Sequence, residues 1–102
     1  MDSSKVRVGQ AGMGGQGWEI AAAVRAASTL ELVACFDPNL EAAQRAAGEY
    51  GGAVVGAFED LLADDSVRGI VVVTPNHLHR EQVVSAARAG KHVFVEKPMA
   101  NT

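Results

Sequence analysis

Residues 69–73 read Gly-Ile-Val-Val-Val, an apolar run without a polar residue at alternate positions. A strand with one face in water alternates apolar and polar side chains, whereas a strand covered on both faces does not. A short run of this kind, rich in β-branched residues, therefore predicts a buried strand of a parallel sheet. This feature constrains the fold strongly, because parallel strands need crossover segments that pack on the faces of the sheet.

The rest of the chain supplies such crossovers in strict alternation. The apolar patterns and the turn residues predict strands at residues 6–11, 30–36, 53–55, 69–73 and 91–95, and helices at 16–27, 40–50, 58–62 and 76–89. Asn39 is expected to cap the second helix, and Val83, Val84 and Ala87 are expected to form the inner face of the last one. Five strands that alternate with four helices predict a doubly wound α/β fold of the Rossmann type.

Composition limits the chain to one domain and narrows its partners. With 102 residues and a net charge of −3, mixed along the chain, residues 1–102 are expected to form one domain that binds neither nucleic acid nor membrane. The single cysteine, Cys35, lies in an apolar run, so we expect a buried and unreactive thiol. A lone cysteine and the lack of an apolar leader segment favour a cytoplasmic location. His77 and His79 are two residues apart without a third ligand nearby, so no metal site is expected.

A glycine-rich loop follows the first predicted strand and opens the first predicted helix, which is the context that gives the pattern G-x-G-x-x-G its meaning. It reads Gly12-Met13-Gly14-Gly15-Gln16-Gly17. Gly12 would permit a tight turn, Gly14 would let a pyrophosphate approach the backbone, and Gly17 would let helix and strand pack closely. The free N–H groups from Gly14 to Gln16 would bind the anion at the positive end of the helix dipole. The alternative is a flexible glycine turn that binds no ligand.

Asp37 lies at the end of the second predicted strand, where an acidic residue can accept hydrogen bonds from an adenosine ribose. A carboxylate there repels the additional phosphate of NADP, and no arginine follows directly to compensate, so NAD is favoured over NADP. The alternative is a surface turn aspartate in front of Pro38. Gln10 is unexpected inside a buried strand. Either its amide bonds to neighbouring backbone or the strand register differs by one residue, and both are favoured over a cofactor contact.

Two further segments resemble the N-terminal domain of the glucose–fructose oxidoreductase and inositol dehydrogenase family (Gfo/Idh/MocA). They read V-V-T-P-N-H-L-H from Val72 to His79, and A-G-K-H-V-F-V-E-K-P-M-A from Ala89 to Ala100. With the glycine loop and Asp37, the resemblance runs from about Lys5 to Asn101. It implies an NAD(P)-dependent oxidoreductase that transfers hydride to or from a CH–OH group of a sugar or cyclitol.

The resemblance also implies roles for single residues. Lys97 matches the lysine of the E-K-P triplet, which in this family lies beside the nicotinamide and the reacting carbon and there can move a proton. Glu96 would orient Lys97 or contact the ribose. The cofactor cleft at the carboxyl end of the fourth strand would be lined by Thr74, Pro75, Asn76 and His79.

Members of this family continue into a sixth strand and a substrate-binding domain, which have no counterpart within residues 1–102. We therefore expect this chain to bind cofactor without turning over substrate. The alternative is a non-catalytic module that senses a nucleotide or binds a partner. The last predicted strand would form an exposed edge through which two copies could pair as a homodimer.

Overall fold

The computed structural model describes residues 5–74 and 76–95, except for the side chains of Asn76 and His77. Within these residues the strands are β1 (Val6–Ala11), β2 (Leu30–Phe36), β3 (Ala53–Val54), β4 (Gly69–Val72) and β5 (His92–Val95). They alternate with the helices α1 (Gln16–Ala26), α2 (Leu40–Tyr50), α3 (Phe58–Ala63) and α4 (Asn76–Arg88). The predicted order of elements is confirmed, and the ends differ by a residue or so. None of the described helices is long and apolar enough to cross a membrane.

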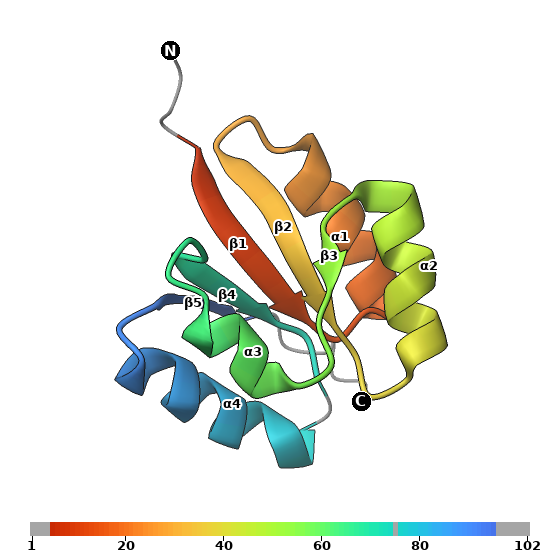
Figure 1. Cartoon of the computed structure of the whole chain (residues 1–102). Coiled ribbons are helices and arrows are strands. Elements are labelled where there is room, and N and C mark those ends of the chain that lie inside the picture. The colour runs from red at the N-terminus through yellow and green to blue at the C-terminus, as the bar shows by residue number, and fades with distance from the viewer. Residues whose placement is uncertain (1–4, 75, 96–102) are drawn as a thin grey trace, which may run out of the picture.

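The strands form one parallel sheet in the order β3-β2-β1-β4-β5, with helices on both of its faces (Figure 1). The chain moves outward from β1 to β3 and then returns to the other side of β1 with β4. The order therefore reverses between β1 and β4. In open α/β sheets, ligands bind outside the carboxyl ends of the strands at such a switch point. The predicted doubly wound fold is confirmed.

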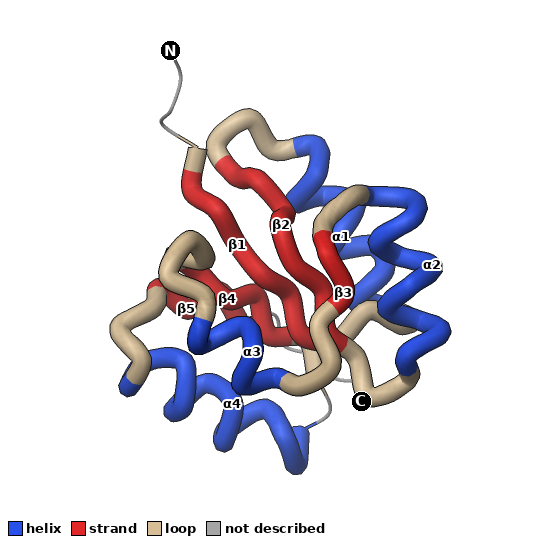
Figure 2. The backbone as a smooth tube through the Cα atoms, in the orientation of Figure 1, coloured by secondary structure: helices blue, strands red, loops and turns tan. Residues whose placement is uncertain are grey.

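Helices lie on both faces of the sheet (Figure 2), and an apolar cluster on each face holds them to it. On one face, Val8 of β1 packs with small residues of α1 and α2, among them Ala21 and Ala43. On the other face, Ile70 of β4 packs with residues of α3 and α4, such as Leu61. Alanines at these contacts let the helices approach the sheet closely. The end of β1, from which the glycine loop continues, is thereby held by helices on both faces of the sheet.

The predicted inner face of α4 is partly wrong. Val83 packs against the core, but Val84 is 42% exposed and Ala87 is also exposed. Gln82 and Ala86 are buried instead. Gln82 faces inward because its Oε1 accepts a hydrogen bond from the Thr74 hydroxyl at 2.8 Å, which satisfies a polar group that the pattern would place in water.

Cys35 is fully buried in β2, as the apolar run around it predicts. Burial raises the pKa of its thiol to about 11, because the charged thiolate loses its hydration there. The thiolate is the reactive form of cysteine, so this side chain is unreactive at neutral pH.

Strand β5 is one of the two edge strands of the described sheet and pairs with β4 on one side. Phe94 and Val95 are each 41% exposed there. Pairing of two copies through this edge stays a prediction. If it occurs, sedimentation equilibrium of residues 1–102 will show a concentration-dependent dimer mass, and Phe94→Lys will shift the equilibrium to the monomer. A monomer mass at every concentration would rule out the dimer.

Two glycines in helices provide a matched test of the packing at the switch point. A Cβ on Gly17 would lie 2.2 Å from the Gly12 carbonyl oxygen, whereas a Cβ on Gly48 would meet no atom within 4 Å. Gly17→Ala should therefore lower the free energy of unfolding by about 1–3 kcal/mol. Gly48→Ala, inside α2, should raise it by about 0.5–1 kcal/mol. Urea unfolding measures both, and an equal effect of the two substitutions would contradict this account of the loop.

Candidate functional site

The loop between β1 and α1 is fixed to the strands on both sides of β1. The Gly12 amide donates to the Phe36 carbonyl at the end of β2 at 2.9 Å, and the Val73 amide after β4 donates to the Ala11 carbonyl at 2.8 Å. Gly12 has a φ of +100°, and a Cβ there would lie 2.1 Å from the Val73 carbonyl oxygen. Only glycine fits this conformation and this close approach.

Gly17 is required by the packing of the same loop. It lies in the first turn of α1, directly against the Gly12 carbonyl. The first and last glycines of the motif thus bring the start of α1 close to the end of β1. The packing of the chain explains why both positions are glycine, without any role for a ligand.

Gly14 differs from both. It is exposed, and a Cβ there would meet no atom within 4 Å. The backbone amides of Gly14, Gly15 and Gln16 find no acceptor among the described residues. These amides lie at the start of α1, where the helix dipole favours an anion. The lack of a side chain at Gly14 therefore leaves open backbone that a pyrophosphate can approach, so the residues present fit a dinucleotide.

Asp37 connects this loop to the segment that leads into α2. One carboxylate oxygen accepts a hydrogen bond from the Met13 amide at 2.8 Å, and the other accepts one from the Asn39 amide at 2.8 Å. Asn39 in turn caps α2 by accepting from the Ala42 amide at 3.2 Å, as predicted. Asp37 therefore forms the expected turn and also holds the glycine loop. Its oxygens have further lone pairs with which to accept from a ribose hydroxyl.

A pocket of about 300 Å³ lies between the glycine loop and α2. Met13, Gly14 and Gly15 form its loop side. Trp18 and Arg45 extend into it from the two helices. Trp18 is half-buried and packs edge-on against Tyr50, with ring centroids 4.8 Å apart.

Arg45 is a residue that the sequence reasoning missed. No arginine follows Asp37 directly in the sequence, but Arg45 lies further along, within α2. Because α2 begins at the same edge of the sheet, Arg45 still lines the pocket at the glycine loop. The position of Arg45 depends on how α2 lies on the sheet, so no spacing in the sequence indicates it.

The second half of the predicted site is only partly described. Thr74 is buried, and its methyl carbon lies 3.4 Å from the position that a Cβ on Gly12 would take. The structure thus places Thr74 beside the glycine loop, but its hydroxyl is bonded to Gln82. His79 is half-buried, and its Nε2 has no hydrogen-bond partner within the described residues. Four other predicted site features lie outside the described residues: Pro75, the side chain of Asn76, Glu96 and Lys97.

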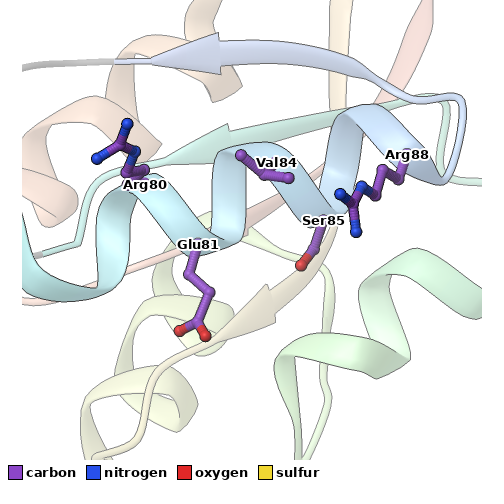
Figure 3. Close-up of a pocket in the computed structure, with 5 residues that line it drawn as sticks. All are labelled: Arg80, Glu81, Val84, Ser85 and Arg88. Carbon is purple, nitrogen blue, oxygen red and sulfur yellow. The ribbon is translucent and has the colours of Figure 1, made fainter.

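A larger hollow, of about 580 Å³, lies on the outer face of α4, away from the glycine loop. Its lining side chains all come from this one helix, and Figure 3 shows that they do not converge on a common point. They are Arg80, Glu81, Val84, Ser85 and Arg88. Nowhere in the described ranges do three or more potential metal ligands gather. The glycine loop and its surroundings therefore remain the candidate site, because their backbone amides can bind an anion.

The substitution Gly14→Ala tests whether Gly14 is needed for ligand binding and not for the stability of the fold. Since a Cβ at Gly14 has free space around it, the free energy of unfolding should change by less than about 0.5 kcal/mol. The added methyl group should still keep a pyrophosphate from the backbone and weaken dinucleotide binding by tenfold or more, which is about 1.4 kcal/mol. Calorimetric titration beside urea unfolding measures both quantities. Unchanged binding in the variant would show that Gly14 does not contact the ligand.

Comparison with known proteins agrees with this geometry. A family model described as an oxidoreductase family with an NAD-binding Rossmann fold, GFO_IDH_MocA, matches residues 6–102. A curated relative, 1,5-anhydro-D-fructose reductase of Ensifer adhaerens, is 44% identical over 71% of this chain and 22% of its own length.

Two solved structures have the same fold. One is a 3-ketoreductase from Actinomadura kijaniata in complex with NADP and TDP-benzene, with a TM-score of 0.86, 34% identity, and coverage of 94% of this chain and 30% of that one. The other is a protein of gentamicin A biosynthesis in complex with NAD, with a TM-score of 0.88, 30% identity, and coverage of 95% and 28%. The chain thus spans less than a third of each protein that it matches here.

Proposed function

Because the chain belongs to the Gfo/Idh/MocA oxidoreductase family, whose NAD-binding Rossmann fold it contains, we propose that it binds NAD for a dehydrogenase of sugars or cyclitols. The observation that carries this proposal is the difference among the loop glycines. Gly12 and Gly17 are explained by internal packing, whereas Gly14 leaves open backbone at the start of α1. A turn without a ligand would have no need of glycine at that position.

Each part of the site has a separate task in this proposal. The amides of Gly14, Gly15 and Gln16 hold the pyrophosphate, and Asp37 accepts from the adenosine ribose. The cleft beyond β4 takes the nicotinamide ribose and ring, with Thr74, Pro75, Asn76 and His79 along it. The bound cofactor supplies the hydride acceptor.

Proton transfer is assigned to Lys97. Its ammonium group would polarise the substrate oxygen and move its proton, while Glu96 would orient Lys97 or contact the ribose. These roles follow from the E-K-P triplet and its place after β5. Two relatives are named for reactions on sugar derivatives, 1,5-anhydro-D-fructose reductase and a dTDP-3,4-didehydro-2,6-dideoxy-alpha-D-glucose 3-reductase, which supports a CH–OH group as the reacting centre. We further propose that residues 1–102 bind cofactor without turnover and that the protein is cytoplasmic.

NAD is proposed over NADP because Asp37 follows the end of β2, where a carboxylate can accept from the adenosine ribose and would repel the additional phosphate of NADP. Relatives of this fold bind either cofactor. Arg45 acts in the opposite sense, since it lines the same pocket as Gly14 and its guanidinium group can attract a phosphate. The preference for NAD over NADP thus depends on two opposing effects, the repulsion of the additional phosphate by Asp37 and its attraction by Arg45. We therefore expect the preference to be moderate.

Titration calorimetry with NADH and NADPH tests this proposal. We expect saturable binding of both and a preference for NADH of about 1–3 kcal/mol, set by the charge at Asp37. Asp37→Asn keeps one acceptor oxygen and removes the charge, so it should reduce the preference tenfold or more. Arg45→Ala should weaken NADPH more than NADH. Saturable binding of neither cofactor by the natural chain would overturn the proposed function, and unchanged preference in Asp37→Asn would overturn the role of Asp37.

A further inference from the structure

Gln10 is a fully buried amide in the central strand of the sheet, between Cys35 of β2 and Val71 of β4. Its side-chain nitrogen donates two hydrogen bonds, to the Gly12 carbonyl at 3.0 Å and to the Gly17 carbonyl at 2.8 Å. The orientation of the amide is defined by these partners, because the reverse orientation would place its oxygen against two carbonyl oxygens. Of the two explanations that the sequence offered, bonding to neighbouring backbone is confirmed.

Stability alone does not explain an amide at this position. The side chain gives up its hydration, and its Oε1 finds no hydrogen-bond partner in the part of the chain that the structure describes. A buried acceptor without a partner opposes folding, whereas an apolar side chain of similar volume would avoid this cost. The amide therefore has another effect, and its two bonds show where that effect lies.

Both bonds fix peptide units of the glycine loop. A peptide unit is planar, so its carbonyl and its N–H point in opposite directions. With the Gly12 carbonyl held inward by Gln10, the Met13 amide points the other way, to Asp37 at 2.8 Å. With the Gly17 carbonyl held inward, the Trp18 amide of the same unit closes the first turn of α1 by donating to Gly15 at 3.0 Å.

Such fixation matters because glycines offer little resistance to peptide rotation. A rotated unit would turn a carbonyl oxygen toward the anion site and repel a phosphate. We propose that Gln10 is a positioning residue that locks both ends of the glycine loop, so that only N–H groups face the dinucleotide phosphates before the ligand binds. The inference rests on the proposed function for its ligand, but the lock itself is a property of the free chain.

Hydrogen exchange of the free chain tests the lock without any ligand. Gln10→Met keeps the length of the side chain and removes both donors. Val67→Ala, a fully buried residue between α3 and β4 and away from the loop, is the control for a general loss of stability. At matched global stability, the Gly17 and Trp18 amides should exchange about tenfold faster in Gln10→Met than in the control. Equal exchange in the two variants would overturn the lock.

Binding provides the second readout. The single tryptophan, Trp18, lines the pocket at the loop, so its fluorescence reports NADH binding directly. Gln10→Met should weaken NADH about tenfold, as expected when a loop must be ordered by its ligand, while Val67→Ala stays within about twofold of the natural chain. Tight binding by Gln10→Met would overturn the positioning role.

Gln10→Glu adds a pH dependence that a purely structural role would not produce. The protonated carboxyl group can donate one hydrogen bond, and the ionised group can donate none. NADH affinity of this variant should therefore fall about tenfold more than that of the natural chain between about pH 6 and pH 9. Parallel pH profiles would overturn the inference. If the natural chain bound no NADH, the proposed function would fail, and the exchange rates would still decide for or against the lock.

Discussion

A close backbone approach joins the end of β1 to the start of α1, where Gly17 lies directly against the carbonyl of Gly12. The remaining features of the site depend on it. It sets the position at which the positive end of α1 meets the carboxyl edge of the sheet, beside the place where the strand order reverses. A side chain at Gly17 would push α1 away from the end of β1, and one at Gly12 would clash with the Val73 carbonyl after β4, so the glycine loop would lose its shape.

The fold could be predicted from sequence because each element carries its own local signal. The uninterrupted apolar run of β4, the cap at Asn39 and the glycines that end the helices are all short-range features. The inner face of α4 was less predictable, since Val83 and Val84 are equally apolar and only one of them packs against the core. What decides between them is the hydrogen bond of Gln82 with Thr74, a contact between two elements.

The site was predictable to the extent that it depends on backbone. Glycine spacing indicates where the chain must turn and approach closely, and the structure agrees at Gly12 and Gly17. Side chains that reach the loop from elsewhere carry no such signal. Arg45 reaches it through the direction of α2, and Gln10 does so through the face of β1 that points to α1. Both positions depend on how the helices lie on the sheet, and the spacing of residues in the sequence does not indicate this.

The double engagement of Asp37 has a consequence for how cofactor preference can change in such a chain. Its carboxylate accepts hydrogen bonds from the Met13 and Asn39 amides, and in the proposed function it also faces the adenosine ribose. In that proposal, the discrimination between cofactors and the shape of the glycine loop depend on the same side chain. A replacement that only removes the charge leaves two amides to be satisfied, and one that only fills space leaves the part-buried Met13 amide without an acceptor. Drift from one cofactor to the other is thus confined to side chains that still accept hydrogen bonds, or to paired changes in which a second residue takes over the loop.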